Sequence, residues 1–229
     1  MDKLVKYLCI IQARVNSSRL PAKVMLDLDG KTLLERVYQS VQTSTKIDKI
    51  IVATSNENTD DIIELKLSTL GVTVYRGSLN NVLERFYDAA KKYKAVNIIR
   101  VTADNPLMDG NIIDELITIY EKNKCNYSMF SNAVYGLSAE IFSFHSLEKA
   151  NAFARNDFDK EHVTPYIKDN EKVYIKDIKK EYRKPNISAT IDTINDYIKM
   201  QQFYLNCTKN SLEVNIDNFI LWEEESKNA

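Results

Sequence analysis

The sequence LVKYLCIIQ at residues 4–12, followed at once by ARVNSSRLPAK at residues 13–23, decides the fold. The first stretch is a short apolar run bounded by polar residues, which predicts a buried strand. Residues 14–29 are polar and predict a loop. Residues 32–43 carry apolar side chains at helical spacing and predict a helix. The chain therefore begins with a strand, a long polar loop and a helix.

Strands and helices continue to alternate through the first half of the chain. The predicted strands cover residues 49–54, 72–76 and 97–102, and the predicted helices begin near residue 58 and cover residues 81–93 and 110–123. This alternation predicts an α/β fold with a mostly parallel central sheet flanked by helices. Ligands of such sheets bind beyond the carboxyl ends of the strands, so the loops that follow the strands are where a site is expected.

The second half of the chain is less regular and gives no reason to divide it from the first. It predicts strands at residues 126–131, 140–144 and 172–178, and helices at 146–154, 160–170, 195–205 and 217–225. A length of 229 residues suits one α/β domain. We therefore expect a single domain over residues 1–229.

Composition excludes several classes of protein. With 44% apolar residues, 28% charged residues and a net charge of −1, the chain has no overall basic field for nucleic acid. Cys9, Cys125 and Cys207 are odd in number and far apart, which predicts a reducing compartment and no disulfide framework. The apolar run near Cys9 is too short for a membrane span or a signal-peptide core. The expected location is the cytoplasm.

The loop after the first strand gathers three cations, Arg14, Arg19 and Lys23, together with hydroxyl groups that include Ser17. Cations and N–H donors held in place bind a dense anion such as a triphosphate. Residues 12–23 contain no glycine, so the loop is neither a Walker loop nor a dinucleotide fingerprint. The alternative is a solvated surface loop, which its position at a strand end disfavours.

Two carboxylates follow strands elsewhere. Asp104 comes just after the strand at residues 97–102, in a loop with Pro106, and Asp192 precedes a predicted helix. Mg²⁺ prefers one or two carboxylates together with phosphate oxygens and waters. Asp104 could instead form a turn, and Asp192 could instead cap the helix. Only pairing of the two in space would make a metal site.

Several motifs in order make the sequence similar to a known family. They are QARVNSSRLPAK at 12–23, YRGS at 75–78, VLERFY at 82–87, RVTADNPL at 100–107, EHVTPY at 161–166 and IDT at 191–193. Together they resemble the CTP-dependent cytidylyltransferases, which include the CMP-Kdo and CMP-sialic acid synthetases. The greatest likeness is to the spore-coat polysaccharide biosynthesis branch, and it runs from about Leu8 to about Tyr204.

The resemblance implies a Rossmann-like nucleotidyltransferase fold, a small β arm at about residues 127–144 and a homodimer. It implies catalytic roles for Arg14, Lys23 and Asp104, and Mg²⁺ as a cofactor held by Asp104 and Asp192. Acceptor contacts are expected from Glu140, His162 and Thr164, with His162 either a base or a structural helix residue. The implied nucleotide-binding residues are Gln12, Ala13, Arg14, Ser17, Arg19, Lys23, Ser78, Arg85 and Thr102.

The implied reaction is transfer of CMP from CTP to a small sugar-like, acidic or phosphorylated acceptor, with release of pyrophosphate, for surface polysaccharide biosynthesis. No nucleic acid or membrane partner is expected. The chain departs from the family pattern at Ser138, where an acid is usual, and at Ala103, where this branch often has glycine. Ser138 leaves open an inactive nucleotide-binding relative. The motif Asp27-Leu28-Asp29, an acidic DxD, leaves open a glycosyltransferase, although its place before the first long helix favours a turn with Gly30.

Overall fold

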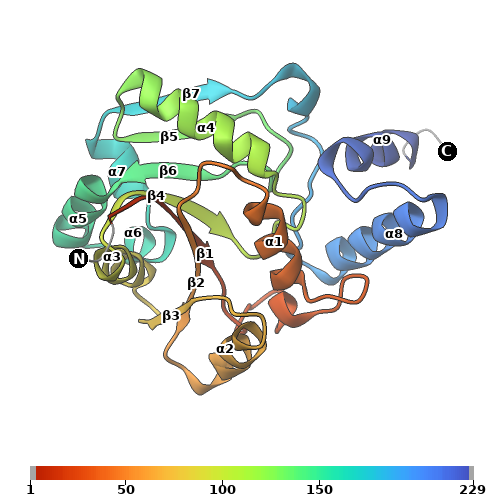
Figure 1. Cartoon of the computed structure of the whole chain (residues 1–229), viewed down its shortest axis with the longest axis horizontal. Coiled ribbons are helices and arrows are strands. Elements are labelled where there is room, and N and C mark those ends of the chain that lie inside the picture. Colours follow the sequence, from red (N-terminus) through yellow and green to blue (C-terminus); the bar gives the residue numbers. More distant parts are fainter. Residues whose placement is uncertain (1–3, 227–229) are drawn as a thin grey trace.

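The computed structural model describes residues 4–226. In this part of the chain seven strands form one sheet, in the order β3-β2-β1-β4-β6-β5-β7, and β6 alone runs antiparallel to the others (Figure 1). The α/β fold with a mostly parallel sheet is confirmed. The strands are β1 (Val5–Gln12), β2 (Lys49–Ser55), β3 (Val74–Gly77), β4 (Ala95–Thr102), β5 (Tyr127–Ser131), β6 (Glu140–Ser143) and β7 (Val173–Asp177).

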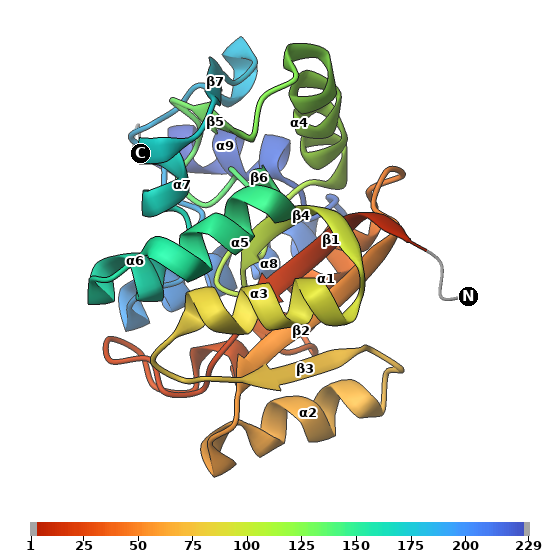
Figure 2. The same cartoon turned by 90° about the vertical axis from the view of Figure 1, so that its left-hand side faces the viewer.

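Helices cover both faces of the sheet, and Figure 2 shows α3, α5 and α6 on one of them. The centre of strand β1 is apolar because it is buried on both sides: Leu8 and Ile10 pack with α3 and α5, whereas Cys9 and Ile11 pack with α1, α4 and α8. The helices are α1 (Leu33–Gln42), α2 (Asp61–Ser68), α3 (Val82–Lys92), α4 (Gly110–Asn123), α5 (Phe144–Phe153), α6 (Asp157–His162), α7 (Pro165–Asn170), α8 (Ile194–Asn210) and α9 (Ile216–Ser226).

One expected helix, at residues 160–170, is wrong. The structure has two short helices there, α6 and α7, separated by Val163 at φ +69°. Pro165 is the first residue of α7, where its missing N–H leaves no bond unmade. The break turns the chain so that Thr164 and Lys168 both reach Glu140 on β6.

The segment predicted as a small β arm does not stand apart from the domain. Its strands β5 and β6 lie inside the central sheet, between β4 and β7. Tyr127, Ile141 and Phe142 are fully buried, so these strands are covered on both faces. The residues between them, 132–139, cross the carboxyl edge of the sheet. The homodimer stays a prediction from the resemblance.

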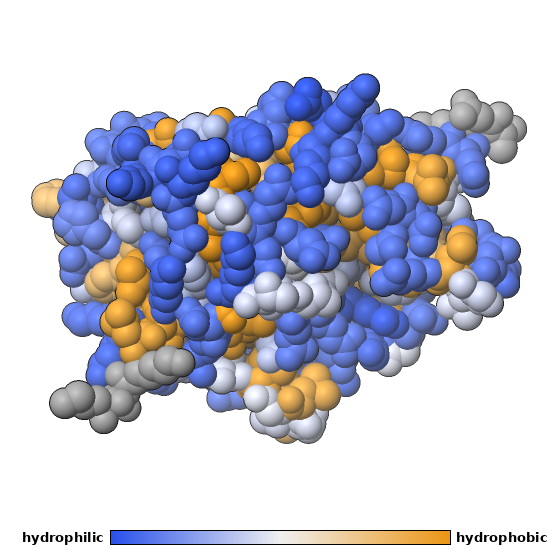
Figure 3. Space-filling model, turned by 45° about the horizontal axis from the view of Figure 1, so that its top comes forward, coloured by the Kyte–Doolittle hydropathy of each residue, from blue (hydrophilic) through white to orange (hydrophobic). Residues whose placement is uncertain are grey.

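The Asp27-Leu28-Asp29 motif is part of a turn, as expected. The Gly30 N–H donates to Asp27 Oδ1 at 3.1 Å, and both Asp29 and Gly30 have positive φ, a conformation that glycine adopts without strain. No helix between residues 4 and 226 is both long and apolar enough to span a membrane. The face seen in Figure 3 is mostly hydrophilic, with apolar residues in small separate areas.

Candidate active site

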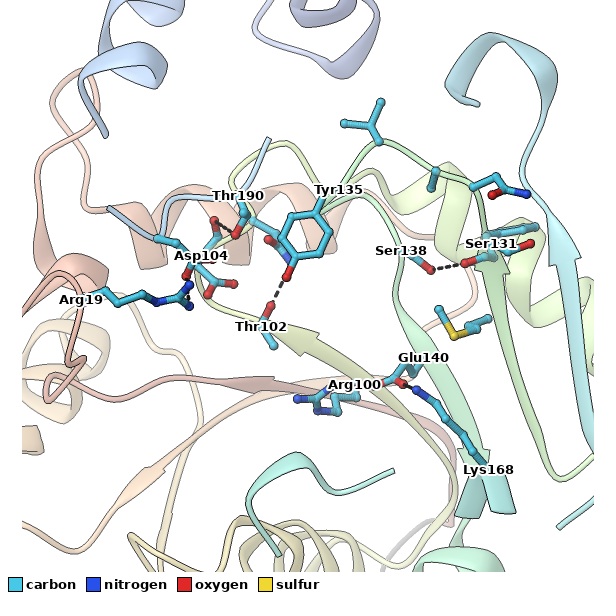
Figure 4. Close-up of a pocket in the computed structure, with 18 residues that line it drawn as sticks. Arg19, Arg100, Thr102, Asp104, Ser131, Tyr135, Ser138, Glu140, Lys168 and Thr190 are labelled. Carbon is cyan, nitrogen blue, oxygen red and sulfur yellow. Dashed lines mark hydrogen bonds and ion pairs between the residues drawn. The ribbon is translucent and has the colours of Figure 1, made fainter. Parts of the chain in front are cut away.

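Two adjoining cavities open at the carboxyl ends of β1 and β4. The smaller, of about 170 Å³, lies against the loop that follows β1, and we call it the loop cavity. The larger, of about 540 Å³, extends over β4, β5 and β6, and we call it the sheet cavity (Figure 4). Four residues line both: Arg19, Thr102, Asp104 and Asp192. The two cavities therefore meet at the predicted metal ligands.

The loop after β1 is held by one buried carboxylate. Asp60 Oδ1 accepts the Val15 N–H at 2.8 Å, while its Oδ2 accepts from the Thr54 hydroxyl and from the N–H and hydroxyl of Ser55 at 2.5 to 3.0 Å. Burial by itself would raise the pKa of Asp60, but these hydrogen bonds lower it below its usual value. The sequence predicts only that a helix begins near residue 58 and gives no sign of this anchor.

Asp60→Asn should lower the free energy of unfolding by about 3 kcal/mol at neutral pH, because an amide cannot accept from all four donors. The depressed pKa of Asp60 means that this contribution is present above the unfolded value of about 4 and is lost as pH falls through the folded pKa. Urea unfolding should thus show the two proteins converging in acid. Asp61→Asn is the control, since Asp61 is exposed and pairs only at the surface with Arg76. Equal losses in both variants would contradict the anchoring role.

Lys23 joins the two predicted metal ligands. Its Nζ donates to Asp104 Oδ2 at 2.8 Å, to Asp192 Oδ1 at 2.9 Å and to the carbonyl of Ile191 at 2.9 Å. The side chain of Lys23 is only 10% exposed. Arg19 Nη2 lies 2.8 Å from the same oxygen of Asp192. The two carboxylates thus lie close together around a single ammonium group.

Asp192 is not a helix cap. Thr193 caps α8 instead, because its hydroxyl accepts from the Asp196 N–H while Asp196 reaches back to Thr193, a reciprocal capping box. The Asp192 carboxylate is left to face Lys23 and Arg19. The carboxylate of Asp104 likewise faces Lys23 rather than forming a turn.

The donor set suits one kind of metal ion better than others. Within residues 4–226 no three His, Cys, Asp or Glu side chains gather closely enough to enclose a metal. A structural zinc site needs four such ligands, whereas Mg²⁺ binds to one or two carboxylates when substrate phosphates and waters complete its coordination shell. Asp104 and Asp192 open onto both cavities, so they fit Mg²⁺ bound together with a phosphate-bearing ligand.

A second charged cluster lies in the sheet cavity around the buried carboxylate of Glu140. It accepts from Arg100 Nη1 at 2.5 Å and from Lys168 Nζ at 2.7 Å (Figure 4). It also accepts from the Tyr127 hydroxyl at 2.5 Å and from the Thr164 hydroxyl at 2.9 Å. Burial would raise the pKa of Glu140, but the charges of Arg100 and Lys168 lower it to about 2. Glu140 is therefore ionised at neutral pH. Sequence reasoning named Glu140 and Thr164 but missed the two cations.

Most of the predicted nucleotide-binding residues line the cavities, and two do not. Gln12, Ala13, Arg14 and Ser17 line the loop cavity along with the shared residues and Lys23. Ser78 and Arg85 line neither cavity. Arg85 is 1% exposed and donates to the carbonyl of Ser78 at 2.9 Å, while its Nε and Nη2 are buried without a partner. Burial lowers the pKa of Arg85 to about 10.

His162 lies outside both cavities. It is exposed at the end of α6, and its ring packs on Phe158 with the centroids 4.4 Å apart. Arg14 reaches the same helix, with its Nη2 3.3 Å from Glu161 Oε1. Ser138 lines the sheet cavity, where its hydroxyl donates to the carbonyls of Phe130 and Ala139. The Ser138 hydroxyl, which stands where the family usually has an acid, is therefore hydrogen-bonded to the main chain of β5 and of the residue that follows it.

Comparison with known proteins gives one consistent result. The profile of a family described as "Cytidylyltransferase" matches residues 8–224. An uncharacterized protein of Methanocaldococcus jannaschii is 40% identical over 93% of this chain and 87% of its own length. The spore coat polysaccharide biosynthesis protein SpsF of Bacillus subtilis is 35% identical over 86% of this chain and 85% of its own.

Solved structures agree with these relatives. A cytidylyltransferase from Leptospira borgpetersenii superposes with a TM-score of 0.85 at 31% identity, over 98% of this chain and 95% of that one. A CMP:2-keto-3-deoxy-manno-octonic acid synthetase complexed with CTP superposes with a TM-score of 0.66, over 88% of this chain and 99% of that one. Its identity is 14%, so this second likeness concerns the fold alone.

Proposed function

The chain belongs to the cytidylyltransferase family, and from that premise we propose that it transfers CMP from CTP to a small sugar-like, acidic or phosphorylated acceptor and releases pyrophosphate. We further propose that the product serves surface polysaccharide biosynthesis, as the name of the Bacillus subtilis relative says of that protein. The observation that carries the proposal is the meeting of the two cavities at Asp104 and Asp192, with Lys23 between them.

The loop cavity suits the triphosphate. Arg14, Arg19 and Lys23 supply the charge, and Ser17 supplies a hydroxyl at its wall. Cations that are already in place when the α-phosphorus is attacked stabilise the negative charge that builds on the departing pyrophosphate. Lys23 is the best held of the three because it is buried and makes three hydrogen bonds. We assign it to the leaving pyrophosphate.

We propose Asp104 and Asp192 as ligands of Mg²⁺, which when bound would polarise the α-phosphate and help to orient the acceptor. The acceptor then lies in the sheet cavity, on the other side of these carboxylates from the triphosphate loop. In-line displacement requires the attacking oxygen and the leaving group on opposite sides of the phosphorus, and a triphosphate and an acceptor in these two adjoining cavities would meet that requirement. The chain contributes mainly positioning and charge.

The sheet cavity offers no strong general base among the described residues that line it. Its carboxylates are paired with cations, Glu140 has a pKa of about 2, and His162 lies elsewhere. An acceptor oxygen that arrives already ionised needs no such base. We therefore propose a carboxylate or phosphate oxygen as the nucleophile, or an oxygen activated by the metal.

A cytoplasmic location is part of the proposal, because the three cysteines are buried and unpaired, and cell fractionation tests it.

Calorimetric titration of CTP, UTP, ATP and GTP, each with Mg²⁺, into the purified protein tests the proposal. CTP should bind at least about tenfold more tightly than the other three, a difference of about 1.4 kcal/mol. Pyrophosphate release with a panel of acceptors then tests turnover. Failure to bind any nucleotide would contradict the proposal, and tight CTP binding with no pyrophosphate release across the panel would favour an inactive relative.

A further inference from the structure

Within residues 4–226, Arg14 is the one cation of the loop cavity whose carboxylate partner lies outside both cavities. The other two cations of that cavity pair with the two predicted metal ligands, which line the cavities themselves. Arg14 Nη2 instead lies 3.3 Å from Oε1 of Glu161, on α6. A carboxylate from a separate helix therefore occupies a guanidinium group that faces the expected triphosphate site.

The contact between Arg14 and Glu161 is a weak one. The two side chains are 38% and 52% exposed, so water and salt screen the pair. A triphosphate carries several negative charges and brings more than one oxygen to which a guanidinium group can donate. It is therefore a better partner for Arg14 than a single exposed carboxylate is. The same negative charges repel the carboxylate of Glu161.

Helix α6 itself is held by few contacts. Of its residues Asp157–His162, Asp159 alone is buried, and the ring of Phe158 is left 63% exposed. Figure 2 shows α6 and the loop that follows β1 at the same end of the molecule. A segment that buries so little side chain can shift at a small cost in free energy, without unfolding the rest of the domain.

The turn that joins α6 to α7 is strained. Val163 has φ +69° and ψ −50°, and the Thr164 N–H donates to the His162 carbonyl at 2.8 Å across this one residue. This is the rare form of the three-residue γ-turn, and a β-branched residue such as valine seldom adopts it. Strained backbone persists only where its surroundings hold it, and it gathers at sites that move in function. The turn directly follows the helix that carries Glu161.

We propose that Glu161 competes with a polyphosphate for Arg14, and that a polyphosphate bound in the loop cavity displaces Glu161 and releases α6 about the turn at Val163. Glu161 then lowers the affinity of the free protein for its ligand, and it acts only through Arg14. The inference rests on the proposed function only in naming that polyphosphate a nucleotide. The contact is regulatory, since Glu161 takes no part in the transfer itself.

Calorimetric titration of inorganic triphosphate into the full chain tests the inference without a nucleobase or an acceptor. Glu161→Gln should bind triphosphate about three- to fivefold more tightly than wild type, which is the size of effect that one exposed ion pair gives. The gain should shrink as the salt concentration is raised from about 50 mM to about 500 mM.

Asp157→Asn is the matched control. It removes the same charge from the same face of α6, one turn away, but Asp157 is fully exposed and pairs with Lys160 rather than with Arg14. Its affinity for triphosphate should stay within about 1.5-fold of wild type. A tighter Glu161→Gln beside an unchanged Asp157→Asn separates the contact with Arg14 from a general loss of negative charge.

A double variant and hydrogen exchange complete the test. Arg14→Gln should weaken triphosphate binding, and in that background Glu161→Gln should change the affinity by less than about 1.5-fold, because a pairwise interaction vanishes once either partner is absent. In wild type, the amide hydrogens of residues 159–164 should exchange faster when triphosphate is bound, since α6 is then released. The Thr164 N–H, which closes the strained turn, belongs to this group.

Three results would overturn the inference: no triphosphate binding up to about 10 mM, an affinity that Glu161→Gln leaves unchanged or lowers, and a gain that persists undiminished in the Arg14→Gln background. The test is separate from that of the proposed function. A chain that shows the effect of Glu161→Gln on triphosphate but never binds CTP would refute the function alone. A chain that binds CTP equally well in Glu161→Gln and wild type would refute the inference alone.

Discussion

Asp104→Asn should lower kcat for CMP transfer at least about 10³-fold and change the free energy of unfolding by about 1 kcal/mol or less. The amide has nearly the same shape as the carboxylate but cannot neutralise a divalent cation. The fold survives because Lys23 keeps its bonds to Asp192 and to the Ile191 carbonyl, and because the Ile191 N–H still donates to the main-chain carbonyl of residue 104. Pyrophosphate release and urea unfolding measure the two quantities.

Two further variants sharpen this test. Asp114→Asn is the matched control: Asp114 accepts from the N–H and hydroxyl of Thr45, away from both cavities, so its replacement should cost about 1 kcal/mol of stability and leave kcat unchanged. The double variant Asp104→Asn with Asp192→Asn should be little worse than either single one, because residues that act as a unit are not additive. A near-normal kcat in Asp104→Asn, or full additivity in the double variant, would remove Asp104 from the proposed metal site.

The fold could be predicted from the first half of the sequence because each element there has a local signature. Strand β1 is apolar on both faces, and α1 begins with Thr32 and Glu35, which form a capping box. The second half could not be predicted as well. The antiparallel insertion of β6 next to β4 is a long-range pairing that no local pattern contains, and the positive φ of Val163, which separates α6 from α7, is a conformation that a β-branched residue rarely adopts.

The site divides in the same way. Lys23, Asp104 and Asp192 could be named because they stand in motifs that resemble those of the family, and the structure places all three together. Asp60 and Lys168 could not be named from the sequence, because the role of each depends on a contact with a residue far away in the chain. Asp60 lies 45 residues along the chain from Val15, whose backbone N–H it accepts. Lys168 has no local feature that distinguishes it from the other lysines, and only the position of α7 brings it to Glu140.

Lys23→Met should lower kcat about 10²- to 10³-fold and, at the same time, make the nucleotide-free protein bind Mn²⁺ more tightly. Methionine fills nearly the same volume but removes the charge, so the pyrophosphate loses one stabilising cation. It also leaves the carboxylates of Asp104 and Asp192 close together with only Arg19 beside them. Removing one partner of a buried ion pair costs about 3 kcal/mol of stability, and a divalent cation between the two carboxylates would restore part of it.

The midpoint of thermal unfolding measured against Mn²⁺ concentration tests this directly, since it reports on the two carboxylates without any substrate. The midpoint of Lys23→Met should lie below that of wild type without metal and should rise further on addition of Mn²⁺. Lys6→Met is the control, because Lys6 forms an exposed pair with Glu121 whose loss should affect neither quantity. If Lys23→Met gained nothing from Mn²⁺, Asp104 and Asp192 would be partners of a lysine and not a cation site. If its kcat were normal, the charge that the leaving pyrophosphate needs would have to come from Arg14 and Arg19 alone.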